Sequence, residues 1–435
     1  MTATDTLTLL HPGDSGYDEA RTVWNAMVDR RPAAIARCRS TAEVAAAVRY
    51  ARANDLELAV RCGGHNIAGL AVPEGGLMID LTPMGEVEVD PDAKVARVQG
   101  GALLGDLDRA AQQYGLATTA GNVSHTGVGG LTLGGGMGWL ARQYGLACDN
   151  VISYELVTAD GDVVTASAQE NPHLFWGLRG GGGNFGIVTG FVFRLHQIGT
   201  RALVADFTYP TAEAFPVLQA WRDLNATAPR QATFTAYING DQVTIGFVWV
   251  GAPGNPDELL EAFRAMGNAT SETVEEMSYL TLQTRDDSIQ GHRFRRYWKG
   301  HYFKTLPDKA IRALLRNPGI GASLQAYGGA ISEVPDEDAA FSHRDTLFEF
   351  VTATRWDDPA ADAERIATIR TYAATLDQYA GGAYLNTLNG ETVNRAFPPA
   401  KLARLTTLKT IWDQANIFHL NQNIKPAGAL EHPAR

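Results

Sequence analysis

The chain has 435 residues, 45% of them hydrophobic, which is enough for a large core and predicts two or three domains. Its net charge of −11 argues against a nucleic-acid partner, since such a partner favours a basic face, and no apolar run approaches the roughly 20 residues that cross a membrane. The N-terminus lacks the basic segment of a signal peptide, and the three widely spaced cysteines form neither a disulfide framework nor a metal-binding pattern. We therefore expect a reduced, cytoplasmic setting.

The first elements form a strand–helix–strand unit. Ser40 and Glu43 have the spacing of a capping box, which predicts the start of an alanine-rich helix. The alternating run LELAV follows as a strand and ends at a pair of glycines. The strand thus opens onto a bare loop, RCGGHN at residues 61–66, that carries a single histidine.

The other elements of the first 200 residues mix strands, helices and glycine-rich loops. We expect strands at 76–81 and 94–99, a helix at 102–115, a hairpin at 151–167 that turns at Asp160-Gly161, and a glycine loop that enters a strand at 175–195. This half of the chain is therefore predicted to be α+β.

After about residue 200 the glycines become fewer and the strands alternate more clearly. The stretch 234–250 predicts strands, and 255–267 and 360–379 predict helices. This pattern indicates a second domain in which helices accompany an antiparallel sheet. Near the end, a predicted helix at 400–414 precedes an extended, asparagine-rich tail at 416–426.

Three glycine-rich loops lie in the first half of the chain, at residues 61–66, 121–138 and 177–186. Glycines can simply serve turns, but they also let backbone N–H groups approach a ligand closely, and successive amides form concavities that bind anions. One of the loops contains GVGGLTLGGGMG, which has no charged side chain. Three such loops together favour a long phosphate-bearing cofactor over turns alone.

The stretch GMGWLA at 136–141 formally satisfies the dinucleotide fingerprint of a nicotinamide-dependent dehydrogenase. That fingerprint requires a strand before it and an acidic ribose-binding residue after the βα unit. Here a glycine loop precedes it, and Glu155 and Asp160 fall within the expected hairpin, so we interpret the match as a decoy. The sequence also lacks P-loop, H-E-x-x-H and C-x-x-C patterns, which leaves no motif for a metal site.

Four stretches, taken together and in order, resemble one known family. They are RCGGHN, GVGGLTLGGGMGWLARQYGLACDNV, LFWGLRGGGGNFGIVTGFVFRL and ANIFHLNQNIKP, and the match runs over about 30–200 and 380–426. In this combination the chain resembles the berberine bridge enzyme-like flavoproteins, which have the vanillyl-alcohol-oxidase (PCMH) type of FAD-binding fold. The resemblance implies a two-part FAD-binding domain at 1–199, a substrate domain with an antiparallel sheet and helices at 200–383, and a segment at 384–435 that returns to the FAD domain.

The resemblance also implies how FAD is held. His65 occupies the place of the histidine that bonds covalently to the flavin 8α-methyl group. Many members add a second bond from a cysteine, but Val123 stands at that place and Cys148 lies beyond the glycine loop, so we predict one covalent bond. The other implied FAD contacts are Arg61, Cys62, Gly63, Gly64, Asn66, Gly69, Val123, Ser124, Thr126, Gly127, Gly129, Gly134, Gly138, Asn184, Gly186, Ile187, Val188, Asn421 and Asn423.

Thr126 bears on the electron acceptor. Family members that use oxygen well often have a small aliphatic residue at this position, which is thought to face the flavin edge that meets oxygen. We expect oxidation of a small-molecule alcohol or amine with molecular oxygen as acceptor. The hydroxyl of Thr126 keeps a dehydrogenase with another acceptor open, and a non-catalytic relative that only binds flavin or another ligand also stays open.

Hydride transfer from an alcohol or amine to flavin N5 requires a base within hydrogen-bond reach of the departing proton. A tyrosine can serve if nearby cations lower its pKa from about 10. The resemblance points to the Y-x-N segment, with Tyr384 as the base and Asn386 beside it. The reserve candidates are His301, Tyr297, Lys299 and His125. The aromatic residues that could line a substrate pocket, or equally belong to the core, are Tyr297, Trp298, Tyr302 and Trp356.

Overall fold

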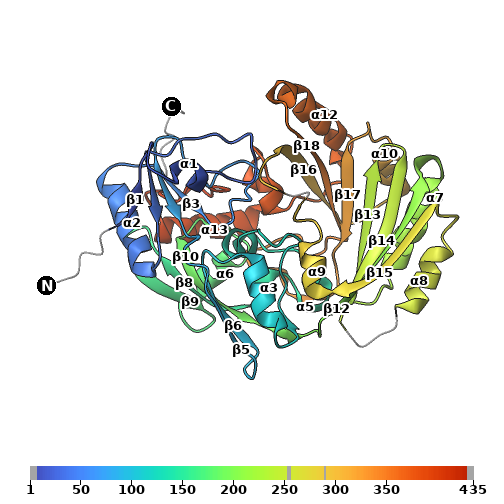
Figure 1. The fold of residues 1–435 in the computed structure, drawn as a ribbon, viewed down its shortest axis with the longest axis horizontal. Coiled ribbons are helices and arrows are strands. Elements are labelled where there is room, and N and C mark those ends of the chain that lie inside the picture. Colours follow the sequence, from blue (N-terminus) through green and yellow to red (C-terminus); the bar gives the residue numbers. More distant parts are fainter. Residues whose placement is uncertain (1–6, 252–255, 289–290, 429–435) are drawn as a thin grey trace.

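The computed structural model describes residues 7–251, 256–288 and 291–428. Two lobes lie side by side, one formed by the first 200 residues together with the C-terminal part of the chain, the other built around a large sheet (Figure 1). Within the described ranges, no helix is both long and apolar enough to cross a membrane.

The first lobe contains two main sheets. A four-stranded sheet has the order β1 (Leu9–Leu10), β2 (Ala34–Arg37), β4 (Leu77–Asp80) and β3 (Leu58–Arg61), and its last three strands are parallel. An antiparallel sheet has the order β5 (Val87–Asp90), β6 (Val95–Gln99), β10 (Ile187–Arg194), β8 (Val151–Val157) and β9 (Val163–Ser167). A short pair of strands, β7 (Leu116–Ala117) and β11 (His196–Gln197), completes the lobe. The predicted strand–helix–strand unit and the predicted hairpin are confirmed.

Helix α2 (Thr41–Ala53) is the predicted alanine-rich helix, and its N-terminus departs slightly from the expected capping box. Ser40 Oγ accepts a hydrogen bond from the amide of Glu43 at 3.2 Å, as expected. The carboxylate of Glu43, however, accepts from the amide of Arg39 at 2.8 Å, one residue before the N-cap. The helix therefore begins where the sequence predicts, with the box extended by one residue.

Two glycine-rich stretches contain helices that the sequence did not predict. Part of the loop 121–138 forms α4 (Val128–Leu133), and the start of the third glycine stretch forms α6 (Pro172–Leu178). Gly177 lies inside α6, and only glycine fits at this position, because a Cβ there would lie 2.2 Å from the side chain of Leu408. This glycine thus serves close packing of a distant helix, which its neighbourhood in the sequence does not reveal.

The second lobe is a seven-stranded antiparallel sheet. Its order is β15 (Ser271–Ser278), β12 (Arg201–Pro210), β14 (Gln242–Val250), β13 (Ala232–Asn239), β17 (Gly321–Ala326), β18 (Phe348–Trp356) and β16 (Arg295–Phe303). Four helices cover its outer face (Figure 1): α7 (Ala214–Asn225), α8 (Asp257–Arg264), α10 (Asp308–Leu314) and α12 (Asp362–Ala374). Their apolar side chains and the sheet form one core, and together with the first lobe this confirms the predicted α+β class.

The inner face of the large sheet packs against the first lobe. Tyr302 and Tyr327, from β16 and the end of β17, share an apolar cluster with Met137 and Tyr384. Helices of the two lobes also pack in pairs: α3 (Leu104–Gln112) lies beside α9 (Tyr279–Thr284), and α5 (Ala141–Tyr144) lies beside α11 (Ala330–Glu333). Helix α1 (Tyr17–Ala20) belongs to the first lobe. The two lobes therefore share a boundary built from segments far apart in the sequence.

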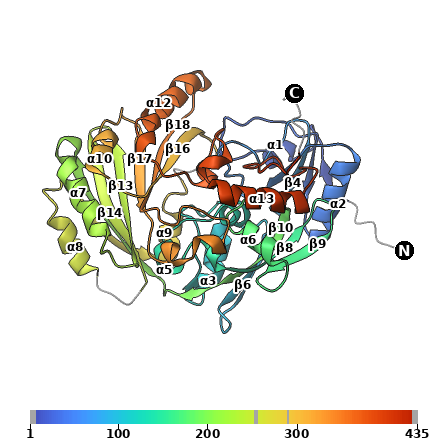
Figure 2. The ribbon, with the colours of Figure 1, turned by 180° about the vertical axis from the view of Figure 1, so that it is seen from behind.

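The C-terminal part returns to the first lobe, where α13 (Pro399–Trp412) packs beside α6 (Figure 2). Lys409, a residue of this helix, has a fully buried ammonium group. It donates to Asp413 Oδ2 at 2.6 Å, to the carbonyl of Asn184 at 2.8 Å and to the carbonyl of Phe418 at 2.9 Å. A buried charge is tolerated when it is paired and fully hydrogen-bonded. Lys409 thus fixes the extended tail against the third glycine loop.

Candidate functional site

A cavity of about 410 Å³ lies where the glycine loops, the tail and the large sheet meet. Its walls are the loop after β3, the glycine loops around 121–131 and 182–188, the segment 384–387 and the tail at 418–422, with Trp24 and Trp298 at the side. The predicted site residues among its lining are Cys62, Gly63, Gly64, His65, Asn66, Val123, Thr126, Gly127, Gly129, Gly186, Ile187, Val188, Tyr384, Asn386 and Asn421. Segments that the sequence separates by more than 300 residues therefore build one site.

Several predicted contact residues hold the loops in place instead of lining the cavity. A Cβ on Gly138 would lie 1.6 Å from the carbonyl oxygen of Ala120, and a Cβ on Gly134 would lie 2.1 Å from Asn386 Oδ1. The members of this group are Arg61, Gly69, Ser124, Gly134, Gly138, Asn184 and Asn423. These glycines are required by close packing between protein segments.

Hydrogen bonds explain three of the four polar members of that group, whereas the Oδ1 of Asn423 is buried without a hydrogen-bond partner in the described structure. Arg61 donates to Asp80 Oδ1 at 3.2 Å, which pins the start of the histidine loop to β4. Ser124 binds the carboxylate of Asp287 through its amide at 2.9 Å and its hydroxyl at 2.6 Å. Asn184 accepts from the amide of Ile424 at 2.9 Å and so ties the third glycine loop to the tail.

The cavity has the properties of a cradle for a large ligand. A Cβ on Gly130 or Gly183 would meet nothing within 4 Å, so protein packing does not explain these two lining glycines. Three other lining residues carry a buried polar atom without a hydrogen-bond partner in the described structure: Asn122 Oδ1, Asn421 Oδ1 and Trp298 Nε1. Buried polar groups are normally paired, so these atoms are available to a polar ligand. The residues present fit a group such as FAD.

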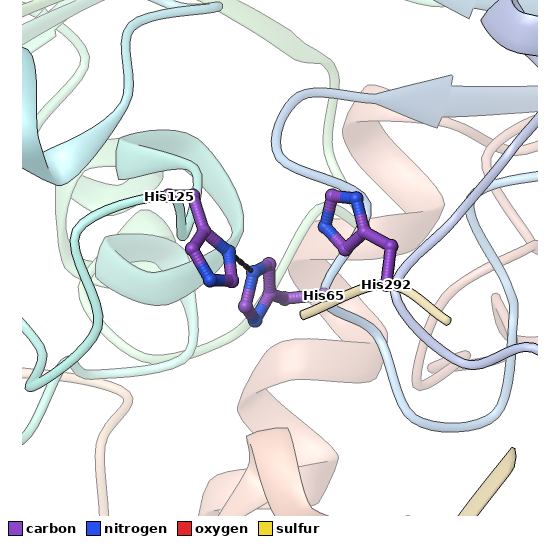
Figure 3. Close-up of side chains that lie close together, drawn as sticks. All are labelled: His65, His125 and His292. Atoms are coloured by element: carbon purple, nitrogen blue, oxygen red, sulfur yellow. Dashed lines mark hydrogen bonds between the residues drawn. The ribbon is translucent and has the colours of Figure 1, made fainter. Parts of the chain in front are cut away.

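His65 stands at the end of the loop after β3 and is held on three sides. Its Nε2 lies 2.7 Å from His125 Nδ1 (Figure 3), and its Nδ1 lies 3.4 Å from Thr126 Oγ1. Its ring stacks on Trp24, with centroids 4.9 Å apart and planes inclined by 16°. Burial, aided by the neighbouring His125, lowers the pKa of His65 well below its usual value of 6.5. The imidazole is therefore neutral and carries a nucleophilic lone pair.

Burial makes the nearby thiols poor nucleophiles, in contrast to His65. Cys62 lines the cavity, but burial raises its pKa to about 11, and its Sγ donates to the carbonyl of Ala102 at 3.4 Å. Cys148 lies in an apolar cluster away from the lining, where burial raises its pKa well above the usual range. Because the thiolate is the nucleophile, neither cysteine is prepared for a covalent bond.

His65, His125 and His292 form a cluster in which each ring offers one nitrogen, and these three nitrogens lie within 4.8 Å of one another (Figure 3). They come from three separate loops, so no sequence motif links them. Such a spacing suits a metal ion, but the positive charges of Arg61 and Arg296 act on His292 at the same place and oppose a bound cation. We therefore interpret His125 and His292 as neighbours that shape the environment of His65 and not as metal ligands.

Tyr384 and Asn386 meet in the cavity, as the Y-x-N segment predicts. The phenol oxygen of Tyr384 accepts from the amide of Gly136 at 2.8 Å and from Asn386 Nδ2 at 2.9 Å. Both bonds favour the phenolate, yet burial raises the pKa of Tyr384 above its usual value of 10, and the carboxyl group of Glu349 adds to that rise. The cations that a tyrosine base would need are not among the groups that shift this pKa.

Strand alternation separates the reserve candidates from the cavity. In β16, Trp298 lines the cavity, and alternate residues of a strand face opposite sides of a sheet. Accordingly, His301 Nε2 contacts the carbonyl of Ala373 at 3.0 Å, and Tyr297 accepts from Arg370 Nε at 2.8 Å, both on the side of α12. Lys299 pairs with Glu391 at 2.5 Å. None of these three is among the lining residues, whereas His125 touches His65 directly.

Comparison with known proteins gives the family. Residues 32–167 match the FAD binding domain family. The chain is 30% identical to (R)-6-hydroxynicotine oxidase of Paenarthrobacter nicotinovorans over 97% of both chains, and 30% identical to glucooligosaccharide oxidase of Sarocladium strictum over 96% of this chain and 92% of that one. The solved structure of BBE-like 1 from Physcomitrella patens superposes with a TM-score of 0.89 at 25% identity, covering 98% of both chains.

These similarities extend over nearly the whole chain. They confirm the predicted resemblance, the FAD-binding fold of the vanillyl-alcohol-oxidase type and the enzymatic class. The protein belongs to the FAD-linked oxidoreductases of the berberine bridge enzyme-like family.

Proposed function

We propose that this oxidoreductase is an oxidase that carries FAD on a single covalent bond from His65 and passes electrons from a small molecule to oxygen. The observation that carries the proposal is the position of His65 in the cavity wall, where burial lowers its pKa, while Val123, which also lines the cavity, offers no thiol. The two named relatives are oxidases of a hydroxynicotine and of an oligosaccharide. This supports an alcohol or amine substrate.

The bound flavin would accept a hydride from the substrate, and the protein would supply position and proton handling. His65 would hold the flavin, and the lining amides and the polar atoms of Asn122 and Asn421 would bind its polar groups. Tyr384, oriented by Asn386 and Gly136, would hold the substrate heteroatom and take its proton.

The proposed organisation follows the same division. We assign residues 1–199 and 384–435 to FAD binding and 200–383 to the substrate domain. The assignment is supported by the large sheet within 201–356 and by the tail, which lines the cavity. A reduced, cytoplasmic location is proposed because Cys38, Cys62 and Cys148 are all free thiols.

The test of the covalent bond is direct. The purified yellow protein is precipitated with acid, washed, and examined for flavin in the pellet and for in-gel fluorescence. The wild-type pellet should stay yellow, and His65→Ala should release all its flavin into the supernatant. A colourless wild-type pellet, or unchanged covalent flavin in His65→Ala, would refute the proposed bond.

A dehydrogenase that uses another acceptor is the second candidate, and the hydroxyl of Thr126 in the cavity wall favours it. Turnover of a panel of alcohols and amines should be measured in air, with peroxide as the readout, and under argon with an artificial electron acceptor. One peroxide per substrate in air supports the oxidase. Fast turnover only with the artificial acceptor, and a gain of peroxide in Thr126→Val, would support the dehydrogenase.

A further inference from the structure

The hydrogen bond between His65 and His125 has no role in the function proposed so far. We propose that His125 is a positioning residue for covalent attachment: it fixes the tautomer of His65 and takes the proton that His65 loses when it bonds to the flavin. The inference rests on the covalent bond proposed above. It goes beyond that bond by assigning the group that makes His65 reactive.

A single chain of hydrogen bonds is consistent with this role. His125 Nε2 lies 3.4 Å from the carbonyl oxygen of Asp287, which can only accept, so Nε2 carries the hydrogen and His125 Nδ1 is an acceptor. The 2.7 Å contact then requires that His65 donates through Nε2–H. His65 Nδ1 is left with its lone pair, toward which the hydroxyl of Thr126 can donate.

The two sides of the His65 ring differ in what they face. Thr126, beside Nδ1, lines the cavity, whereas His125, beside Nε2, is not among the lining residues. The nucleophilic nitrogen therefore belongs to the cavity side, and the nitrogen that carries the proton belongs to the far side. Attack and proton removal can occur at opposite ends of one ring without any rearrangement of the loop.

The surroundings make removal of the proton necessary. When Nδ1 forms a bond while Nε2 still carries hydrogen, the ring becomes a cation. Burial and the positive charge of Arg296 oppose a cation at this place, and they already depress the pKa of His65. His125 Nδ1 is the hydrogen-bond acceptor on Nε2, so it is the group placed to receive the proton.

The position of His125 is itself fixed. The adjacent Ser124 binds the carboxylate of Asp287 by two hydrogen bonds, at 2.9 and 2.6 Å, and the carbonyl of the same aspartate accepts from His125. Asp287 therefore anchors both the backbone beside His125 and its ring. Prearranged geometry of this kind lowers the cost of a proton transfer.

The step balances as follows. One C–H bond of the flavin 8α-methyl group and the Nε2–H bond of His65 break, and a C–N bond forms between the methyl carbon and Nδ1. The two protons leave, one of them through His125, and two electrons enter the flavin. Dioxygen is the oxidant that removes these electrons, and it becomes hydrogen peroxide.

The test compares His125→Asn and His125→Ala with wild type and with His292→Ala as the matched control. Asparagine keeps an acceptor oxygen near the place of Nδ1 but is not basic, so it separates proton uptake from orientation. His292 contacts both other rings, at 5.8 and 5.3 Å between centroids, yet forms no hydrogen bond with either. Each protein is purified with its flavin, and the covalent fraction is followed over time in air by acid precipitation and fluorescence.

Both His125 variants should bind FAD mainly without a covalent bond and attach it about 10²- to 10⁴-fold more slowly than wild type, the usual range for loss of a proton acceptor. Added imidazole should accelerate attachment in His125→Ala, and His292→Ala should behave like wild type. If His125→Asn attached its flavin at the wild-type rate, the proton-acceptor role would be overturned. If both variants attached it at that rate, the whole inference would be overturned. A wild-type protein without covalent flavin would refute the His65 bond itself, which is a different result.

Discussion

Two reactive side chains in the cavity wall, His65 and Tyr384, are both kept neutral by burial, with opposite consequences for their chemistry. At the end of the first glycine loop, burial lowers the pKa of His65, and at the large sheet it raises the pKa of Tyr384. Desolvation disfavours whichever form is charged, so both groups are neutral. A neutral imidazole is ready to attack, whereas a neutral phenol is not yet a base. Desolvation therefore prepares His65 for bonding and restrains Tyr384 from acting as a base.

The immediate neighbours extend this contrast. His65 is hydrogen-bonded to the imidazole of His125, and the positive charge of Arg296 acts on it. Behind Tyr384, Tyr302 and Tyr327 are buried, and Tyr327 donates to the carboxyl group of Glu349 at 2.7 Å. Burial raises the pKa of Glu349 to about 7. The histidine end therefore disfavours added protons, and the tyrosine end retains them.

The largest expected effect comes from removing the phenol oxygen. Tyr384→Phe should lower kcat by about 10²- to 10⁴-fold, the range for loss of a proton acceptor, while total and covalent flavin stay unchanged. Because the pKa of Tyr384 is raised, wild-type kcat should still be increasing at alkaline pH, and the variant should lose that increase. The matched control is Tyr302→Phe, whose side chain lies outside the lining. A wild-type kcat in Tyr384→Phe would show that the phenol of Tyr384 does not take the substrate proton.

An intermediate effect is expected from filling the cavity that joins the ends. A Cβ on Gly183 meets no protein atom within 4 Å, so we expect Gly183→Val to leave the folded protein intact. It should weaken FAD binding by about 1–3 kcal/mol, about 5- to 150-fold in the dissociation constant, because it occupies the ligand's space. Flavin content per protein and the melting temperature measure the two effects separately.

Gly138 provides the control for that substitution. Its Cβ would lie 1.6 Å from a backbone oxygen, so Gly138→Ala should lower the melting temperature first and flavin content only as a consequence. If Gly183→Val retained full flavin content, the cavity as described here would not be the flavin site.

The smallest expected effect concerns pH and stability at the tyrosine end. The pKa of Glu349 is raised from 4.5 to about 7 in the folded protein, so folding binds its proton more tightly. This contribution is lost as the pH rises through about 7, and between pH 6 and pH 8 it amounts to about 1 kcal/mol. In Glu349→Gln, the decrease in the free energy of unfolding over this interval should be smaller by that amount, as measured by urea denaturation.

Asp108 offers a matched comparison, because burial also raises its pKa to about 7 although it lies outside the cavity lining. Asp108→Asn should remove a similar pH dependence of stability and leave the pH profile of kcat unchanged. Glu349→Gln should in addition shift the rise of kcat toward lower pH, since the carboxylate no longer raises the pKa of Tyr384. An unchanged profile would separate Glu349 from the function of the phenol.

Local patterns predicted much of the fold and the histidine loop. Alternation and capping signals located the strand–helix–strand unit, and Asp160-Gly161 located the hairpin turn, because these elements depend on neighbouring residues. The tether role of His65 came from the resemblance to the family, and it stays a prediction. The same reasoning missed α6, since the reason for Gly177 is a contact with Leu408, more than 200 residues later.

The parts of the site that depend on distant contacts could not be predicted. Trp24 stacks on His65 without any motif near it, and Asp287 anchors Ser124 and His125 from the other lobe. The sequence also could not show which face of β16 lines the cavity. Alternation places Trp298 and Tyr297 on opposite sides of the strand, but it does not tell which side meets the cavity. Only the packing of the lobes decides such questions.

The tail at residues 418–422 forms a wall of the cavity, and the buried Lys409 fixes it to the third glycine loop. Chains fold from the N-terminus as they leave the ribosome, so the glycine loops are made long before this wall exists. The FAD site therefore becomes complete only after synthesis has passed residue 422. Binding of a cofactor in this cavity therefore requires that residues 418–422 have been made and have folded back onto the first lobe.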